Sequence, residues 1–149
     1  MTMVYKQIII AIDGSKESEW AFKRAVAIAS RNDAALNLVN IVDTRSHSSI
    51  EAYDRSIAES AFASAEELLS KHKAEAEQAG VQTVNVIVEY GSPKTLIAID
   101  LPKKLGADLI ICGATGLNAV ERFIMGSVSE NIVRSAKCDV LVIRKPDHL

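Results

Sequence analysis

Residues 113–129 read Gly-Ala-Thr-Gly-Leu-Asn-Ala-Val-Glu-Arg-Phe-Ile-Met-Gly-Ser-Val-Ser. The apolar run Asp-Leu-Ile-Ile-Cys precedes this stretch at 108–112, and a helical pattern begins at Gly126. The first turn of a helix leaves its backbone N–H groups unpaired and carries the positive end of the helix dipole. An anion can therefore bind there without a lysine. We expect a phosphate-binding turn between a buried strand and a helix.

The same residues also have purely structural interpretations. Gly113 and Gly116 would allow positive φ angles in a tight turn, and Ser127 with Glu130 has the spacing of a capping box. Taken singly, these interpretations are the simpler ones. Their occurrence together, at this spacing and directly after a buried strand, favours a nucleotide site.

The spacing of the glycines resembles that of the universal stress protein family, and in particular of its ATP-binding branch. Two residues separate Gly113 from Gly116, and nine residues separate Gly116 from the pair Gly126 and Ser127. The stretches Ile-Ala-Ile-Asp-Gly-Ser at 10–15 and Cys-Asp-Val-Leu-Val-Ile-Arg at 138–144 are also similar to that family. The resemblance covers nearly the whole chain.

Length and composition indicate one globular domain, spanning 1–149. The 149 residues are 48% hydrophobic and 24% charged, which is typical of a soluble protein with one sizeable core. The net charge of −2 argues against a nucleic-acid-binding face, which needs clustered positive charge. We find no apolar run long enough to cross a membrane and no signal-peptide pattern, so we expect a cytoplasmic protein.

The two cysteines are expected to be buried or half-buried thiols without a chemical role. Cys112 lies in an apolar run and Cys138 lies just before another. No histidine or cysteine stands at metal-ligand spacing from either residue. We therefore expect neither a disulfide nor a metal site.

Strand and helix patterns alternate along the chain. This alternation implies right-handed crossovers and a parallel sheet with helices on both faces. The continuous apolar run of the first strand is typical of a central position, whereas the third strand alternates in part and should lie nearer an edge. We expect strands at 6–13, 35–42, 83–89, 108–112 and 140–143, and helices at 15–30, 50–79, 93–101 and 126–136.

Particular residues mark where the helices begin and end. Ser15 and Ser92 are expected N-caps, with Pro93 at the first helical position of the third helix. Gly80 is the natural residue to end the long second helix. We expect Pro102 to perturb or end the third helix.

Neither of two histidines is expected to act in catalysis. His72 falls on the apolar stripe of the long helix and is interpreted as a packed or edge residue rather than a ligand. His47 lies in a polar loop with no neighbouring acid or nucleophile that would make it a base.

The resemblance implies a fold as well: an open five-stranded parallel α/β sheet of the Rossmann-like, adenine nucleotide alpha hydrolase-like kind, in the order 3-2-1-4-5. Strands one and four would then be neighbours, and Asp13 and Gly113 would meet in one crevice. Ligands of open α/β sheets bind outside the carboxyl ends of the strands, where the strand order reverses. Asp13 alone would be interpreted as a turn or cap residue, but this position favours a binding role.

The resemblance also implies roles for single residues. Asp13 would approach the adenine or the ribose, and Ile41 would present its backbone to the adenine. The turn after the fourth strand would line the ribose and phosphates through Gly113, Thr115 and Gly116. The start of the last helix would hold the β- and γ-phosphates through Gly126, Ser127, Val128 and Ser129.

Two features depart from the pattern of the family. Relatives often carry a basic or larger polar residue where this chain has Thr115, so one phosphate contact would be weaker here or would be made by Arg122. The segment 117–125 is rich in apolar residues, which we interpret as core or interface packing: Val120, Phe123, Ile124 and Met125.

Other phosphate-binding motifs are absent from the sequence. No Gly-x-x-x-x-Gly-Lys run is present, and the first strand is followed by Asp-Gly-Ser-Lys rather than by Gly-x-Gly-x-x-Gly. A receiver domain would need an acidic pair after the first strand, where this chain has only Asp13. It would also need an aspartate at the end of the third strand, which this chain lacks.

The expected function is that of an ATP-binding stress protein, a nucleotide-dependent sensor or regulator that binds ATP with or without Mg²⁺ or Mn²⁺. Without a visible general base, Walker lysine or acidic metal pair, ATP hydrolysis should be slow or absent. The resemblance implies a homodimer, and an unpaired apolar edge strand at 140–143 would favour one. The alternatives are a nucleotide-free dimeric interaction module of the same fold and a weak ATPase.

Overall fold

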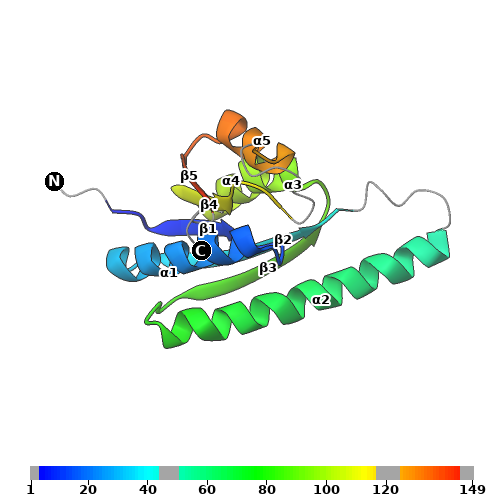
Figure 1. The fold of residues 1–149 in the computed structure, drawn as a ribbon, viewed down its shortest axis with the longest axis horizontal. Coiled ribbons are helices and arrows are strands. Elements are labelled where there is room, and N and C mark those ends of the chain that lie inside the picture. The colour runs from blue at the N-terminus through cyan, green and yellow to red at the C-terminus, as the bar shows by residue number, and fades with distance from the viewer. Residues whose placement is uncertain (1–3, 44–50, 117–124, 145–149) are drawn as a thin grey trace.

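The computed structural model describes residues 4–43, 51–116 and 125–144, and of residues 51–54 the backbone alone. Strands and helices alternate, as Figure 1 shows. The strands are β1 (Gln7–Ala11), β2 (Ala35–Val42), β3 (Val84–Tyr90), β4 (Leu109–Gly113) and β5 (Asp139–Ile143). The helices are α1 (Lys16–Asn32), α2 (Glu51–Gln78), α3 (Pro93–Thr95), the π-helix η1 (Leu96–Asp100), α4 (Leu101–Leu105) and α5 (Ser127–Ser135).

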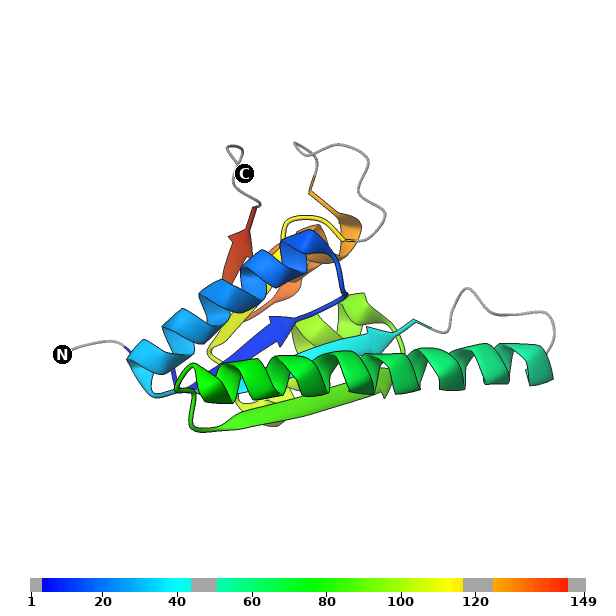
Figure 2. The ribbon, with the colours of Figure 1, turned by 60° about the horizontal axis from the view of Figure 1, so that its bottom comes forward.

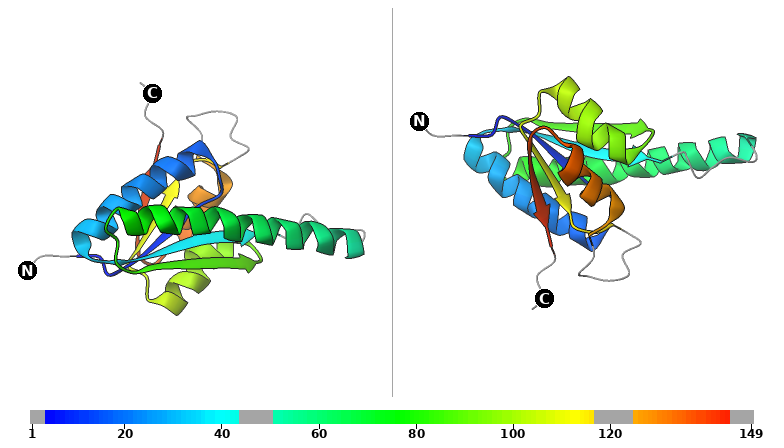
Figure 3. Two further views of the ribbon diagram at one scale, coloured as in Figure 1. Left: turned by 90° about the horizontal axis from the view of Figure 1, so that it is seen from below. Right: turned by 90° about the horizontal axis from the view of Figure 1, so that it is seen from above.

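The five strands form one sheet in the order β3-β2-β1-β4-β5, and all four neighbouring pairs are parallel. This confirms the predicted fold and strand order. Helices α1 and α2 cover one face of the sheet, and α3, η1, α4 and α5 cover the other, as the two views of Figure 3 show. β3 and β5 are the edge strands, and β1 lies at the centre.

The central strands are buried on both faces, which explains their continuous apolar sequences. Ile8 and Ile10 of β1 pack against α1 and α2, whereas Ile9 between them packs against the helices of the opposite face. All three side chains are fully buried. Burial of one such side chain contributes about 1.5–3 kcal/mol. The two hydrophobic layers therefore hold β1 and its neighbours in a fixed register.

Helices α1 and α2 begin and end close to the predicted positions. The Ser15 hydroxyl accepts the N–H of Ser18 at 3.1 Å, so Ser15 caps α1 as expected. Gly80 follows α2 with a φ of 102°, and its N–H and that of Val81 donate to the last turn of the helix, each at 3.1 Å. This pair of bonds is the Schellman motif that a glycine permits.

Of the two predicted effects of Pro102 on the third helix, the structure shows a perturbation and not an end. The helical segment continues through Pro102 to Leu105 and ends at Gly106, whose φ is 67°. Proline has no N–H and would clash with the carbonyl four residues earlier in a regular α-helix. The wider turn of η1, closed by a bond from the Leu101 N–H to the Leu96 carbonyl, precedes Pro102 and makes room for it. Ser92 occupies the N-cap position but its side chain makes no capping bond.

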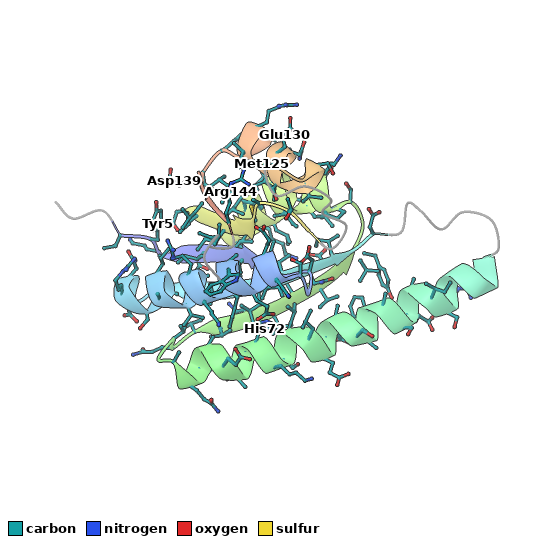
Figure 4. The ribbon with its side chains drawn as sticks, in the orientation of Figure 1. Tyr5, His72, Met125, Glu130, Asp139 and Arg144 are labelled. Atoms are coloured by element: carbon teal, nitrogen blue, oxygen red, sulfur yellow. The ribbon has the colours of Figure 1, made fainter. Side chains whose placement is uncertain are left out.

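His72 is packed between α1 and α2, as predicted. Its ring is 4% exposed and meets Phe22 edge to face at 4.6 Å between ring centres. Its Nε2 lies 2.6 Å from Oε1 of Glu19 on α1, and its Nδ1 lies 2.8 Å from the Leu68 carbonyl. Figure 2 shows that α1 and α2 separate toward their N-terminal ends, and Figure 4 places His72 in the space between them. The ring therefore ties the two helices together where they diverge.

Within the described ranges, no helix combines the length and the apolar character needed to cross a membrane.

Candidate functional site

A cleft of about 620 Å³ opens at the carboxyl ends of the strands. It lies where β1 is flanked by β2 on one side and β4 on the other, which is the point at which the strand order reverses. Its size is that of an ordinary small-molecule site. All nine residues proposed from the sequence line it: Asp13, Ile41, Gly113, Thr115, Gly116, Gly126, Ser127, Val128 and Ser129.

The N-terminus of α5 opens into this cleft. Gly126 is the N-cap, and its own N–H donates to the Ala114 carbonyl at 2.7 Å. The first intrahelical bond runs from the Glu130 N–H to the Gly126 carbonyl at 2.9 Å. The three N–H groups between them have no acceptor among the described residues: those of Ser127, Val128 and Ser129. They form a ready site for an anion.

The capping box that the spacing of Ser127 and Glu130 allowed, as an alternative interpretation, does not form. Ser127 is the first helical residue rather than the N-cap, and the Glu130 carboxylate binds Arg134 at 2.6 Å on the exposed face. The Ser129 hydroxyl donates to the Gly113 carbonyl at 2.6 Å and so fixes α5 to the end of β4. The side chain of Ser129 therefore holds the helix in place, while its backbone N–H faces the cleft.

The structure shows that glycine is required at Gly113 and Gly116 for a reason other than a positive φ angle. Among the described glycines, neither has a φ in the left-handed region. A Cβ atom on Gly113 would lie 2.9 Å from Cβ of Glu17, and one on Gly116 would lie 2.8 Å from Oδ2 of Asp13. Both positions require glycine because other groups approach them closely. The interpretation of these two residues as turn glycines with positive φ is wrong.

Asp13 makes a turn contact and also lines the cleft. One carboxylate oxygen, Oδ1, accepts the Ser15 N–H at 2.9 Å, as in an ordinary turn. The other oxygen lies beside Gly116 on the opposite wall of the cleft. Among the described lining residues Asp13 is the single charged one, so the positive potential for an anion comes from the N–H groups of α5.

The backbone of Ile41 also faces the cleft. The pairing of β2 with β1 stops at Val39, but its pairing with β3 continues to Val42. The Val39 carbonyl points to β1, where it accepts the Ile12 N–H at 2.9 Å. Backbone groups two residues apart in a strand point to the same side. The N–H and C=O of Ile41 therefore point to the side of β1, beyond the last residue at which β1 pairs with β2.

The inner wall of the cleft is apolar. Cys112 of β4 lies on it and is 3% exposed. Burial raises the pKa of the Cys112 thiol to about 11. The thiol is therefore neutral at physiological pH and acts as one more apolar group of the wall. Cys138 is half-buried and, like Cys112, is not in a disulfide.

In the described part of the chain, no three side chains of the metal-binding types gather into a possible site. Thr115 lines the cleft and is 7% exposed. Arg122, the proposed alternative phosphate contact, and the apolar residues of 117–124 lie outside the described residues. Met125 does line the cleft, and Figure 4 shows it beside α5, so this residue is not solely a core or interface residue.

Several lining residues were not proposed from the sequence as binding residues. Most are apolar, and nothing in the sequence distinguishes them from core residues. Asn40 is different, because it is a polar residue near the end of an apolar strand, and that position was a usable signal. These residues are Ala11, Ile12, Ser18, Val39, Asn40, Pro93, Ile97, Cys112 and Ile132.

Comparison with known proteins identifies a matching family and related proteins. The sequence profile of the Universal stress protein family matches residues 4–144. A protein of Staphylococcus haemolyticus named as a universal stress protein is 56% identical over 142 residues, which cover 95% of this chain and 86% of that protein.

Solved structures with the same fold include the universal stress protein UspA from Lactobacillus plantarum. It is 29% identical, with a TM-score of 0.90 over 96% of this chain and 100% of the other. A universal stress protein crystallised in complex with cAMP is 25% identical, with a TM-score of 0.73 over 95% of this chain and 98% of the other.

Proposed function

Because the chain belongs to the universal stress protein family, we propose that it binds ATP in this cleft and acts as a nucleotide-dependent stress sensor or regulator. The observation that carries the proposal is the N-terminus of α5, whose first three N–H groups open into a cleft of nucleotide size. The solved relative in complex with cAMP supports an adenine nucleotide. The remaining walls of the cleft offer contacts for the ribose and the base of ATP.

The strand order suggests how the nucleotide lies. Phosphates would bind at the turn between β4 and α5, and the ribose would lie near Asp13 at the end of β1. The base would then reach β2, which lies two strand spacings, about 10 Å, from β4. There the N–H and C=O of Ile41 form a donor and acceptor pair. Adenine offers the matching acceptor, N1, and donor, the 6-amino group.

A divalent cation, Mg²⁺ or Mn²⁺, would be held mainly by the phosphate oxygens of the nucleotide. The described wall of the cleft offers it one carboxylate, that of Asp13. Magnesium commonly binds in this way, with one or two carboxylates and substrate phosphates. The cation would neutralise phosphate charge that the uncharged α5 donors only partly offset.

We propose that hydrolysis of the bound ATP is slow or absent. Asp13 is the one ionisable group on the described wall that could accept a proton from water, and its Oδ1 already binds the Ser15 N–H. No described lining residue is a lysine or arginine that would stabilise the transferring phosphate. Turnover should stay below about one per second, the low end for ordinary enzymes.

The protein would work in the cytoplasm as a homodimer joined along the edge of β5. A nucleotide-free dimeric module of the same fold is the alternative function. The cleft and the unpaired donors of α5 favour the nucleotide-binding form over this alternative.

Calorimetric titration of ATP with Mg²⁺ into wild type, Gly126→Val and Gly126→Ala tests the proposal. A Cβ atom on Gly126 would lie 3.4 Å from Cα of Thr115, which is ordinary contact, so the alanine variant should fold and bind. The additional methyl groups of valine would crowd the phosphate turn, and binding should weaken at least tenfold in a protein that remains folded. A wild type that releases no heat with ATP would contradict the proposal and favour the nucleotide-free module.

A further inference from the structure

The carboxyl end of β1 has an unusual hydrogen-bond arrangement. In a continued parallel ladder, the Ile12 carbonyl would accept the N–H of Ile41, because the Ile12 N–H already binds Val39 on that strand. No such backbone bond is present between Ile41 and Ile12. Instead, the side-chain amide of Asn40 donates from Nδ2 to the Ile12 carbonyl at 2.8 Å. A side chain has thus taken the place of a backbone donor.

The orientation of the Asn40 amide follows from chemistry. A backbone carbonyl can only accept a hydrogen bond, so the NH₂ group must face Ile12. The alternative orientation would bring two acceptor oxygens together. Asn40 also lines the cleft, next to the exposed backbone of Ile41.

We propose that Asn40 is a positioning residue that keeps the backbone edge of Ile41 open for the base. By satisfying the last carbonyl of β1, the Asn40 side chain removes the acceptor that the Ile41 N–H would otherwise take. The N–H and C=O of Ile41 then stay available as a donor and acceptor pair. The inference rests on the proposed binding of ATP in this cleft.

The energetic balance explains why a side chain is needed. An unsatisfied carbonyl at this partly buried position costs about 1–3 kcal/mol, so Ile12 will be paired in one way or another. Without the amide of Asn40, the nearest donor in the ladder is the Ile41 N–H. Drawing Ile41 onto β1 would close the edge at which the base binds. Asn40 therefore acts through Ile41 rather than through a contact with the nucleotide.

The matched variants are Asn40→Leu and Asn32→Leu. Leucine has the same branching and the same number of heavy atoms as asparagine, is larger because of its methyl groups, and has no donor. Asn32, in the last turn of α1 at the opposite end of the sheet, donates the same kind of bond to the Ile28 carbonyl at 2.8 Å. The control variant loses this bond and also the bond that the Tyr5 N–H donates to Oδ1 of Asn32 at 2.9 Å, both outside the cleft. It therefore reports the effect of a loss of side-chain hydrogen bonds that does not touch the cleft.

The first measurement is amide hydrogen exchange of Ile41 in the nucleotide-free protein. In wild type and Asn32→Leu, the Ile41 N–H should exchange at least about a hundredfold faster than the ladder-bonded N–H of Val39. In Asn40→Leu, the Ile41 N–H should become protected to a similar degree as Val39. Protection of Ile41 in the wild type would overturn the inference.

The second measurement compares the affinities for ATP and ITP. ITP carries an oxo group and an N1–H in place of the 6-amino group and the free N1, so it reverses the donor and acceptor pattern. Wild type and Asn32→Leu should prefer ATP about tenfold, the worth of one net hydrogen bond, and Asn40→Leu should lose this preference.

The two measurements separate failure of the inference from failure of the proposed function. Binding of ATP with an unchanged preference over ITP in Asn40→Leu would overturn the inference alone. A wild type that binds neither nucleotide would overturn both the proposed function and the proposed recognition of the base by Ile41. The ratio of the affinities for ATP and 2′-deoxy-ATP provides a further check. If Asn40→Leu changes this ratio but leaves the preference for ATP over ITP unchanged, Asn40 acts on the ribose. That result would also overturn the inference.

Discussion

Gly113 ends β4 and Gly116 follows it, but a side chain on each would meet different neighbours. At Gly113 the nearest atoms are Cβ and the backbone carbon of Glu17, at 2.9 and 3.0 Å, both fixed parts of α1. At Gly116 the nearest atom is Oδ2 of Asp13, at 2.8 Å, the end of a side chain that can turn away. The two glycines should therefore differ in what their substitution damages.

We expect Gly113→Ala to destabilise the fold and Gly116→Ala to impair binding. The first change forces α1 away from β4 and should cost about 1–3 kcal/mol of unfolding free energy. The second should alter this free energy by less than about 1 kcal/mol but displace the Asp13 carboxylate, weakening ATP binding severalfold. Urea unfolding and calorimetry of both variants measure the two effects. Equal losses of stability in the two variants would contradict this assignment.

The buried thiol of Cys112 predicts a loss of stability at alkaline pH. Its pKa of about 11 in the folded protein lies above the ordinary value of 9.0, because burial disfavours the thiolate. The neutral thiol stabilises the fold fully below about pH 9, and this contribution is lost as the pH rises from 9 to 11. Two pKa units correspond to about 3 kcal/mol.

Urea unfolding of wild type and Cys112→Ala between pH 8 and about pH 10.5 checks this prediction. The free energy of unfolding should fall more steeply with pH in the wild type than in the variant. The pKa of Tyr5 is also raised, mainly by its hydrogen bond to Asp139, but Tyr5 is present in both proteins and cancels in the difference. Parallel pH profiles would show that Cys112 does not titrate as described.

At the scale of the elements, β5 is the edge strand on which the proposed dimer depends. The Ile143 carbonyl accepts the Ala114 N–H at 2.9 Å on the side of β4, so backbone groups of alternate residues in β5 face outward. The N–H of Val142 is one of these outward groups. A proline at this position removes a donor from the free edge without removing one from the ladder with β4.

We therefore expect Val142→Pro to weaken the dimer at least tenfold and to leave the protein folded. The control is Val142→Thr, which keeps both the backbone N–H and the shape of the side chain. Sedimentation equilibrium of the wild type and both variants gives the dissociation constants. A wild type that is monomeric at high concentration, or a dimer unaffected by proline, would rule out association through this edge.

The third helix shows what an element's own sequence leaves undecided. Pro102 correctly marks a disturbance, because its missing N–H must be accommodated in any helix. Whether the helix ends before the proline or widens into a π-helical turn depends on how its residues pack in the fold. Ile97, Ala98 and Leu101 are buried against the sheet, and keeping them there favours the wider turn of η1 over a break.

At the scale of the whole molecule, the site exists because three distant segments end at one edge of the sheet. The turn after β1 supplies Asp13, the end of β2 supplies Ile41, and the start of α5 supplies Gly126. Right-handed crossovers on opposite faces place β1 between β2 and β4, which creates the reversal of strand order. Under the proposed function, a nucleotide bound there would touch all three segments.

The sequence by itself determined the elements, the alternation that makes the sheet parallel, and the glycine turn that lines the cleft. These features are local: hydrophobic period, caps and the unpaired first turn of a helix depend on residues a few positions apart. For this reason Ser15 and Gly80, and the cleft position of the proposed binding residues, were predictable. The strand order came from the family resemblance, which the structure then confirmed.

Only the tertiary structure decided which groups meet. The need for glycine at Gly113 and Gly116 comes from Glu17 and Asp13, which approach them from another segment. The hydrogen bond from Asn40 to Ile12 arises because β2 stops pairing with β1 at Val39 but continues to pair with β3. This relation cannot be read from the sequence of either β1 or β2 alone. Contacts between distant segments depend on the packing of the whole chain, and a local pattern carries no record of them.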